Sequence, residues 1–399
     1  MPSLKRFATV RLPLFSCCLV RVLILLDGGF VISPPCQVCP VFTPDASQQL
    51  PSSATPTSLK SCSNPTRLNV AGVSCVAWTQ RGRQARYAHK SEVIHAIWLA
   101  ERVAWAERGW EHGFFLECSG RYPVIDKLVK ALPDMFHVVF VFDSPTFHDF
   151  PNTRFRLLAF CSSKRTLRWA GPPSIELVQQ DYRARFHKQL QLPGDMLFAA
   201  PQSQVHSEYI KLAARQGYSL SSKDLREGNI DMTDLLRMVL PPGAVTNTLA
   251  WKESLNIPKG SYKIVDVEQH VGHATSDKVW PSMSTHGFMM RIAGGTDLQW
   301  RLATGLEHLG VLGLHLFNGR TTNACPLSPT FRYLKDLPAG HQKRLAGNSM
   351  SLITQASFMA YCLGNIEPAL QPSVPRPIPS PEDGPRSKRL RRRMTCFAL

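Results

Sequence analysis

The chain has 399 residues, of which 44% are apolar, and it carries a formal net charge of +17. This apolar share is enough for a hydrophobic core and excludes a wholly disordered protein. Six of the basic residues lie between Arg386 and Arg393, which leaves +11 for the rest of the chain. A positive charge spread this widely favours a polyanionic partner such as nucleic acid, although an ordinary basic soluble protein has the same balance.

The 11 cysteines are odd in number and follow no regular spacing. This pattern argues against a disulfide framework and favours a reducing compartment. Cys36 and Cys39 form the one Cys-x-x-Cys pair, but neither a second such pair nor a nearby histidine completes a zinc site. We therefore predict no metal site.

Residues 1–66 differ in composition from the rest of the chain. The run from Leu12 to Ile32 is apolar and follows basic residues, as in a signal peptide. Arg21 and Asp27 interrupt the run, and a charge within a membrane span is costly. A membrane or secretory segment therefore stays a minor alternative. Residues 33–67 are rich in proline and serine, and we expect residues 1–66 to be largely disordered.

Residues 67–163 alternate between strand and helix patterns, which predicts an α/β layer fold with sites at the strand ends. The expected elements are an extended segment at 69–71, a helix at 91–108, a strand at 113–117, a helix at 123–132, and strands at 137–142 and 154–161. Ser91 is the expected N-cap of the first helix, and Arg108-Gly109 its expected end. Positions 94, 97, 98 and 105 are expected to face the core.

Four side chains in this block are candidates for chemistry. Cys75 lies on a glycine-flanked loop after a strand, where an α/β enzyme places a nucleophile, although a buried core thiol is the alternative. Glu117 ends a buried strand and either serves a site or pairs with a neighbouring arginine. Arg154 and Arg156 alternate along a strand and therefore point the same way, either into a site or toward solvent.

The order of these segments resembles that of the cytosine-5 DNA methyltransferase family. The segment Gly72-Val73-Ser74-Cys75 resembles the family's Pro-Cys nucleophile loop. Phe115-Leu116-Glu117-Cys118 resembles its Glu-Asn-Val strand end, and residues 150–156 resemble its Pro-Gln-x-Arg-x-Arg segment. Near the C-terminus, residues 281–286 resemble its Pro-Thr-x-Thr-Thr stretch, 301–307 its Arg-x-Leu-Thr-Pro-x-Glu segment, and 344–350 its final Gly-Asn-Ser motif.

The resemblance implies a Rossmann-like, S-adenosylmethionine-dependent methyltransferase core. Cys75 would add to carbon 6 of cytosine, and Glu117 would hold the proton at ring nitrogen 3. Arg154 or Arg156 would supply the positive field that lowers the pKa of the thiol. The target base would have to leave the duplex.

The resemblance also locates part of the donor site and shows where the sequence departs from the family. Asn348 and Ser349 match the family motif that lines the S-adenosylmethionine pocket; Asn348 could at the same time cap the helix expected at 351–363. The glycine-rich donor loop is missing, because cysteines stand within Leu14-Phe15-Ser16-Cys17-Cys18, about where it should be. Ser74 replaces the proline of the nucleophile loop, and Cys118 the asparagine after Glu117.

A rival nucleophile is Cys36, because Pro35-Cys36-Gln37 matches the family's text more literally. Prolines surround it and no helix follows, and it lies 81 residues before Glu117, against 42 for Cys75. The shorter separation leaves room for one helix, so we prefer Cys75.

The remaining segments complete the predicted organisation. Residues 67–163 would form the catalytic core, 164–280 a basic target-recognition region or an ordinary basic surface, 281–365 the C-terminal part of the core, and 366–399 a disordered tail. Trp169, Tyr182 and Phe186 are interleaved with the basic residues of the recognition region, as in nucleic-acid binding. The basic run in the tail predicts nuclear localisation.

Two functions follow from these predictions. The first is a DNA (cytosine-5)-methyltransferase-like enzyme that uses S-adenosylmethionine. The alternative is a catalytically inactive nucleic-acid-binding protein that retains the fold. A protein anchored in the membrane through residues 12–32 is a distant third.

Overall fold

The computed structural model describes residues 8–11, 21–25, 29–32, 66–72, 78, 86–254, 257–269, 271, 278–294, 299–317 and 328–369. The chain divides into two compact units. The first comprises Met1–Phe140, Ala159–Gly171 and Cys362–Leu399, and the second Val141–Leu158 and Pro172–Tyr361. Residues 281–361 therefore group with 172–280, whereas the sequence placed these two stretches in separate regions.

The first unit is built on a sheet with the strand order β1-β2-β3-β4-β5-β7-β6. Its strands are β1 (Ala8–Arg11), β2 (Arg21–Leu25), β3 (Gly29–Ile32), β4 (Thr66–Gly72), β5 (Gly113–Ser119), β6 (Phe136–Asp143) and β7 (Arg156–Ser163), of which the last two continue along the chain into the second unit. β1 to β4 pair antiparallel in succession, and β4 pairs parallel with β5. A second, two-stranded sheet joins β8 (Leu167–Trp169) to β12 (Ile366–Pro368).

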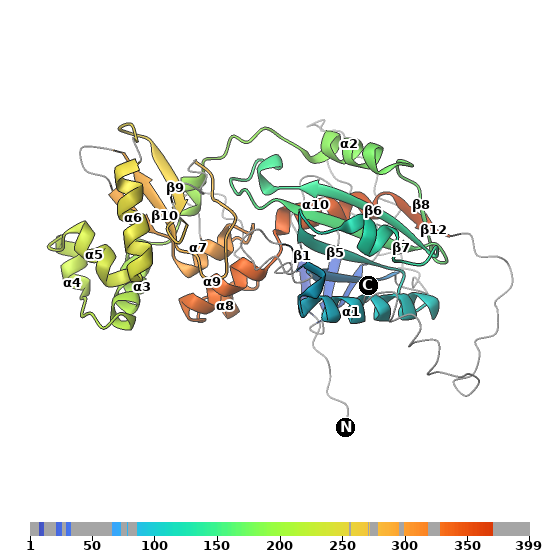
Figure 1. Ribbon diagram of the computed structural model, residues 1–399, viewed down its shortest axis with the longest axis horizontal. Coiled ribbons are helices and arrows are strands. Elements are labelled where there is room, and N and C mark those ends of the chain that lie inside the picture. Colours follow the sequence, from blue (N-terminus) through green and yellow to red (C-terminus); the bar gives the residue numbers. More distant parts are fainter. Residues whose placement is uncertain are drawn as a thin grey trace, which may run out of the picture. The chain divides into compact units, whose positions relative to one another are not determined.

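Helix α1 (Ser91–Glu107) connects the parallel strands β4 and β5 and lies along β5 (Figure 1). A strand, a crossover helix and a parallel strand make up the unit from which Rossmann-like folds are built. The predicted α/β class is therefore confirmed. The short helical turns η1 (Arg86–Ala88) and η2 (Ile125–Val129) complete this unit.

Helix α1 has the predicted length, but a different face of it is buried. Ile94 and Ile97 are 71% and 52% exposed, whereas the face that carries Leu99, Arg102 and Val103 is buried. A buried arginine is tolerated because the Arg102 guanidinium bonds the Glu111 carboxylate at 2.6 Å and lies over the Trp105 ring.

The ends of α1 were predicted with mixed success. Its N-cap is Lys90, which makes no side-chain cap bond, so the prediction of Ser91 was wrong. The predicted end is confirmed, because Arg108 is the C-cap and Gly109 takes a φ of +70°, which favours glycine.

Three other segments differ from the predictions. The helix expected at 123–132 is reduced to the π-helical turn η2, bounded by proline at 123 and 133. Within residues 1–66, where we expected disorder, the strands β1, β2 and β3 are found. β7 begins at Arg156, so Arg154 precedes the strand.

The second unit packs helices against a three-stranded antiparallel sheet of order β11-β10-β9. Its elements are η3 (Pro145–Phe147), α2 (Ile175–Phe186), η4 (Gly194–Leu197), α3 (Gln202–Arg215), α4 (Ser222–Glu227), α5 (Met232–Val239), α6 (Pro242–Ser254), β9 (Tyr262–Asp266), β10 (Met289–Ala293), β11 (Gln299–Leu302), α7 (Gly305–Gly310), α8 (Phe331–Leu334), α9 (Ala339–Asn348) and α10 (Leu352–Leu363), the last of which ends in the first unit.

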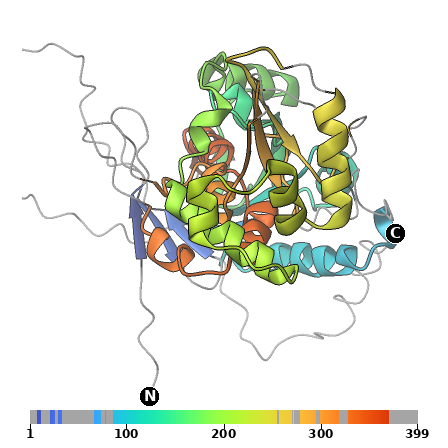
Figure 2. The ribbon, with the colours of Figure 1, turned by 90° about the vertical axis from the view of Figure 1, so that its left-hand side faces the viewer.

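Helices α3, α5 and α6 bury one apolar cluster against this sheet, and α6 runs beside β9 and β10 (Figures 1 and 2). Trp251 of α6 and Met290 of β10 lie in this cluster. A second cluster gathers around Trp280 and includes Leu306 of α7 and Ala346 of α9. This second cluster joins segments that the sequence analysis had treated as separate motifs. The helix expected at 351–363 is confirmed as α10.

No helix among the described residues is long and apolar enough to cross a membrane.

Candidate functional site

Cys75 lies outside the described residues, but the chain on both sides of it is described. On its N-terminal side, Gly72 ends β4 and pairs in parallel register with Glu117 of β5. On its C-terminal side, the Trp78 carbonyl accepts a bond of 3.5 Å from the Ser119 hydroxyl at the end of β5. Both flanks of the cysteine segment therefore meet the same end of β5, where Glu117 lies.

Trp78 is held in this place by a buried polar chain. Its indole Nε1 donates to the Glu92 carboxylate at 2.9 Å, and Lys127 pairs with the second oxygen of Glu92 at 2.7 Å. The indole also packs edge-on against Tyr87, with ring centroids 4.9 Å apart. Because Glu92 belongs to α1, Trp78 is fixed to the crossover helix.

Glu117 is a buried carboxylate, with 6% of its surface exposed. The strand continues to Ser119, so Glu117 lies near its end rather than at it. All seven residues of β5 are buried, which explains the apolar run that predicted the strand. The adjoining Cys118 is fully buried as well.

Tyr122 and His95 form a second buried pair in the first unit. Their Oη and Nε2 atoms are 2.5 Å apart. Burial lowers the pKa of His95 to about 4 and raises that of Tyr122 well above its usual value. The pair is therefore uncharged at neutral pH and contributes a hydrogen bond rather than an ion pair.

In the second unit, residues 150–156 are anchored by hydrogen bonds to the backbone of distant segments. Asn152 is fully buried; its amide donates to the Val311 carbonyl at 3.1 Å, and its Oδ1 accepts from the Arg154 backbone N–H at 3.0 Å. The Thr153 N–H donates to the Trp280 carbonyl at 2.9 Å. Trp280 immediately precedes the family-like segment 281–286, so these two motifs lie together.

Arg154 brings in the third motif, because its Nη2 donates to the Gly347 carbonyl at 3.2 Å. Arg154 itself is 3% exposed. Gly347 in turn lies against the 281–286 segment: a Cβ there would stand 2.6 Å from the Thr285 nitrogen and 2.7 Å from the Ser284 carbonyl oxygen. Only glycine permits so close a backbone approach. Three segments far apart in the sequence therefore converge within the second unit.

The segment 301–307 forms a local capping structure. Thr304 caps α7, and Glu307 completes the capping box by accepting from the Thr304 backbone N–H. Arg301 grips the fully buried Glu307 carboxylate with two nitrogens, at 2.6 and 3.1 Å. The Ala200 N–H adds a fourth bond at 2.8 Å. The residue types of this motif are thus explained by helix capping and a buried ion pair.

The other predicted site residues of the second unit have unlike surroundings. Arg156 opens β7, is half-buried and donates to the Phe155 carbonyl at 2.8 Å, so it does not share the environment of Arg154. Asn348 is the exposed last residue of α9, and Ser349 is the half-buried C-cap. Asn348 therefore does not cap α10, which begins four residues later at Leu352.

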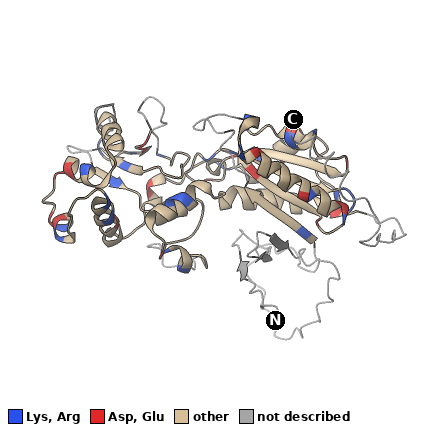
Figure 3. Ribbon diagram, turned by 60° about the horizontal axis from the view of Figure 1, so that its bottom comes forward, with Lys and Arg blue, Asp and Glu red and all other residues tan. Residues whose placement is uncertain are grey.

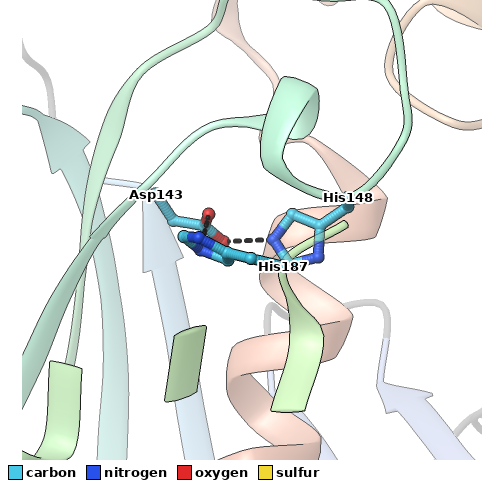
Figure 4. Close-up of side chains that lie close together, drawn as sticks. All are labelled: Asp143, His148 and His187. Atoms are coloured by element: carbon cyan, nitrogen blue, oxygen red, sulfur yellow. Dashed lines mark hydrogen bonds and ion pairs between the residues drawn. The ribbon is translucent and has the colours of Figure 1, made fainter. Parts of the chain in front are cut away.

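The sequence analysis missed a cluster formed by Asp143, His148 and His187 (Figure 4). Asp143 ends β6, and the histidines directly follow η3 and α2. His148 Nε2 lies 2.7 Å from Asp143 Oδ2, and His187 Nε2 lies 3.4 Å from Oδ1. No spacing pattern in the sequence predicts this cluster, because its members follow three different elements. The one available signal is an aspartate at the end of a strand.

In the basic stretch that begins at Lys164, two of the residues that suggested nucleic-acid binding have contacts within the protein. Tyr182 is fully buried, and its hydroxyl donates to Asp143 Oδ2 at 2.7 Å. Arg185 is paired with Asp181 on the same helix. Figure 3 shows acidic and basic residues mixed on the described helices.

The described residues do not form the glycine cradle that a donor nucleotide needs. β2, the antiparallel partner of β1, is the next described element along the chain, and residues 12–20 between them contain no glycine in the sequence. Donor pockets of this fold class lie where a strand turns into a helix. The part of a donor site that the sequence predicted within the described residues is therefore Asn348 and Ser349.

No family model matches the sequence, and no curated protein matches it. Among solved structures, the methyltransferase EhMeth of Entamoeba histolytica is similar over 74% of this chain and 77% of its own, with 11% identity and a TM-score of 0.41. The Dnmt2 methyltransferase of S. pombe is similar over 74% of this chain and 76% of its own, with 12% identity and a TM-score of 0.37. A mutant of Spodoptera frugiperda DNMT2 is similar over 74% of this chain and 79% of its own, with 13% identity and a TM-score of 0.33.

Proposed function

We propose that this chain is a cytosine-5 methyltransferase-like protein that acts on nucleic acid, with Cys75 as its nucleophile. The observation that carries the proposal is the position of both flanks of the cysteine segment: Gly72 and Trp78 meet the end of β5 that holds Glu117. Addition to a cytosine ring requires a thiol and a carboxylate, and in the sequence Cys75 lies three residues after Gly72 and three before Trp78.

The chemistry assigned to these two residues is as follows. The Cys75 thiolate bonds to carbon 6, and the electron pair of the 5,6 double bond makes carbon 5 nucleophilic. Glu117 holds the proton at ring nitrogen 3, which offsets the charge that develops during addition. S-adenosylmethionine, when bound, would supply the methyl group for carbon 5, and loss of the proton from carbon 5 and of the Cys75 sulfur from carbon 6 would then restore the 5,6 double bond. The base must leave the duplex to reach this site.

Arg154 and Arg156 have different parts in this proposal. Arg154 is a positioning residue, because its guanidinium holds the Gly347 carbonyl next to Asn348 and Ser349, our candidates for contact with the donor. Arg156 is the candidate for a phosphate contact, and a field from either arginine that favours the thiolate remains a prediction from the sequence. The nuclear localisation rests on residues 386–393, which lie outside the described residues, and it remains a prediction.

The alternative function is an inactive nucleic-acid-binding protein that retains this core. The observation that favours it is the absence of glycine between β1 and β2, where the family's donor loop would lie. In that case Cys75 and Glu117 are remnants, and nucleic acid binds without methyl transfer.

Calorimetric titration of the full chain with S-adenosylmethionine separates the two functions. Saturable binding supports the enzyme, whereas no binding at millimolar donor supports the inactive scaffold. A second experiment incubates the chain with donor and either DNA or RNA containing 5-fluorocytosine. Fluorine at carbon 5 prevents release of the enzyme after methylation, so the adduct persists.

We expect Cys75→Ser to abolish the adduct and Cys36→Ser, the matched control at the rival position, to retain it. An adduct that survives Cys75→Ser would refute the assignment of the nucleophile.

A further inference from the structure

We propose that Asp143, His148 and His187 form a binding site for one divalent transition-metal ion of the zinc type. The three residues lie in the second unit and take no part in the proposed methyl transfer. Two imidazoles and one carboxylate are a donor set that such ions favour, and they leave at least one position for water or another ligand.

The separation between Asp143 and His187 suits such an ion, whereas that between Asp143 and His148 is a hydrogen-bond distance and must lengthen on coordination. Donors at about 2.0–2.2 Å from a tetrahedral ion lie roughly 3.3–3.5 Å from one another. Here Asp143 lies 2.7 Å from His148 and 3.4 Å from His187, and all three ligand atoms fall within 4.8 Å of one another. Small side-chain rotations therefore bring them to coordination distance (Figure 4).

The backbone holds the two histidines together before any ion binds. The Lys188 N–H donates to the Phe147 carbonyl at 2.7 Å, and residues 148 and 188 form a parallel bridge. The segment after η3 is thereby tied to the segment after α2. His187 also stacks on Phe147, with ring centroids 4.8 Å apart.

Two further groups orient the carboxylate. The Tyr182 hydroxyl donates to Asp143 Oδ2 at 2.7 Å, and the Ser144 N–H donates to Oδ1 at 2.8 Å. Such outer hydrogen bonds fix the direction of a ligand and are typical of built metal sites.

A purely structural hydrogen-bond network leaves part of this cluster unexplained. The His148 contact satisfies that imidazole nitrogen, but His187 Nε2 is buried without a hydrogen-bond partner, facing the carboxylate at 3.4 Å. A buried polar atom without a partner is costly, and coordination to an ion would satisfy it. The His187 side chain is 20% exposed, whereas Asp143 is fully buried, so His187 is the more solvent-exposed of these two residues.

The test is cobalt(II) titration of the full chain after treatment with a chelator, followed by competition with Zn²⁺. Cobalt bound by nitrogen and oxygen shows visible ligand-field bands without the near-ultraviolet charge-transfer band of a cobalt thiolate. The spectrum thus distinguishes this cluster from the chain's cysteines. Neither donor nor nucleic acid is present, so failure here leaves the proposed function untouched, and the reverse also holds.

We expect one equivalent with a nitrogen and oxygen spectrum. His187→Ala and His148→Gln should each weaken binding at least about 100-fold, since loss of outer-shell partners alone costs 10–100-fold. The exposed His341 provides the matched control, and His341→Ala should bind as the wild type does.

Unchanged binding in folded His187→Ala and His148→Gln, checked by circular dichroism, would overturn the proposal. If neither variant folds, the wild type decides: a chain that takes up cobalt only through sulfur, or takes up none, contradicts it.

Discussion

Two regions of the second unit lie only eleven residues apart along the chain, around Arg154 and around Asp143. They differ in whether a sequence motif marks them. Around Arg154, each residue that resembles a family motif has a backbone contact to account for it, to Gly347 or Val311 for example. Around Asp143, two histidines and a tyrosine converge on a carboxylate that no motif marks. The comparison teaches that a recognisable sequence motif can reflect the contacts that hold segments together. Reactive side chains, in contrast, can come together where the sequence carries no motif.

The largest expected effect concerns the structural role of the motif residues. Arg301→Ala leaves the buried Glu307 carboxylate without its charged partner, and breaking a buried pair in this way costs about 3–5 kcal/mol in free energy of unfolding. The control is Arg237→Ala, which removes an exposed ion pair on α5 and should cost less than about 1 kcal/mol. Urea unfolding measures both, and equal losses would show that the motif does not have the structural role assigned to it.

The next effect concerns the unmarked cluster. Asp143→Ala in metal-free protein leaves the Ser144 N–H, the Tyr182 hydroxyl and His148 without their acceptor, which should cost about 2–3 kcal/mol. Tyr182→Phe removes one hydroxyl only and should cost about 1 kcal/mol. If urea unfolding finds Asp143→Ala as stable as the wild type, the carboxylate does not organise these residues.

A pH effect compares the two units through one buried histidine in each. Burial lowers the pKa of His308 to about 3 and that of His95 to about 4, against 6.5 in the unfolded chain. Below pH 6.5 the unfolded chain therefore takes up protons that the folded chain refuses. The free energy of unfolding is therefore highest above pH 6.5, and it decreases as the pH falls toward the pKa values of the two histidines in the folded chain.

The unfolding free energy of the wild type should accordingly fall more steeply than that of a variant that lacks the histidine. Between pH 6.5 and 5, we expect each of His308→Gln and His95→Gln to lose about 1.5–2 kcal/mol less than the wild type. Urea unfolding at the two pH values measures this difference. A variant that loses as much as the wild type would mean that its histidine has the same pKa in the folded chain as in the unfolded chain.

The smallest effect separates the two arginines that the sequence treated as equivalent. Arg154→Ala removes a buried partner of the Gly347 carbonyl and should cost about 1–3 kcal/mol, whereas Arg156→Ala should cost about 0.5 kcal/mol. Thermal unfolding ranks them, and the reverse order would contradict the assignment of Arg154 as the positioning residue.

Much of the first unit could be predicted from the sequence because its signals are local. β5 and β6 are short apolar runs, and α1 has a clear helical period ending at Gly109. The phase of α1 could not be predicted, because the burial of Arg102 depends on Glu111, which lies beyond the helix end. A periodic pattern gives the element but not the partners that decide which face is buried.

The candidate site was predicted only in part, for the same physical reason. The pairing of Gly72 with Glu117 follows from two strands and a crossover helix, and these three elements were predicted from the sequence. The Asp143 cluster depends on a backbone bond between Phe147 and Lys188, which no local pattern encodes. The exposed position of Asn348 at the end of α9 depends likewise on where that helix stops.

The central claim is that Cys75 attacks the cytosine ring, and mapping the modified cysteine tests it most directly. Nitrogen at position 5 of 5-azacytosine makes carbon 6 more electrophilic, so an adduct can form whether or not the donor binds. The full chain would be incubated with an oligonucleotide that contains this base and analysed by peptide mass spectrometry. We predict that the nucleotide is attached to Cys75 and that Glu117→Gln reduces the yield at least about tenfold, as expected for a group that acts in proton transfer. Attachment to Cys36, or to no cysteine at all, would contradict the account.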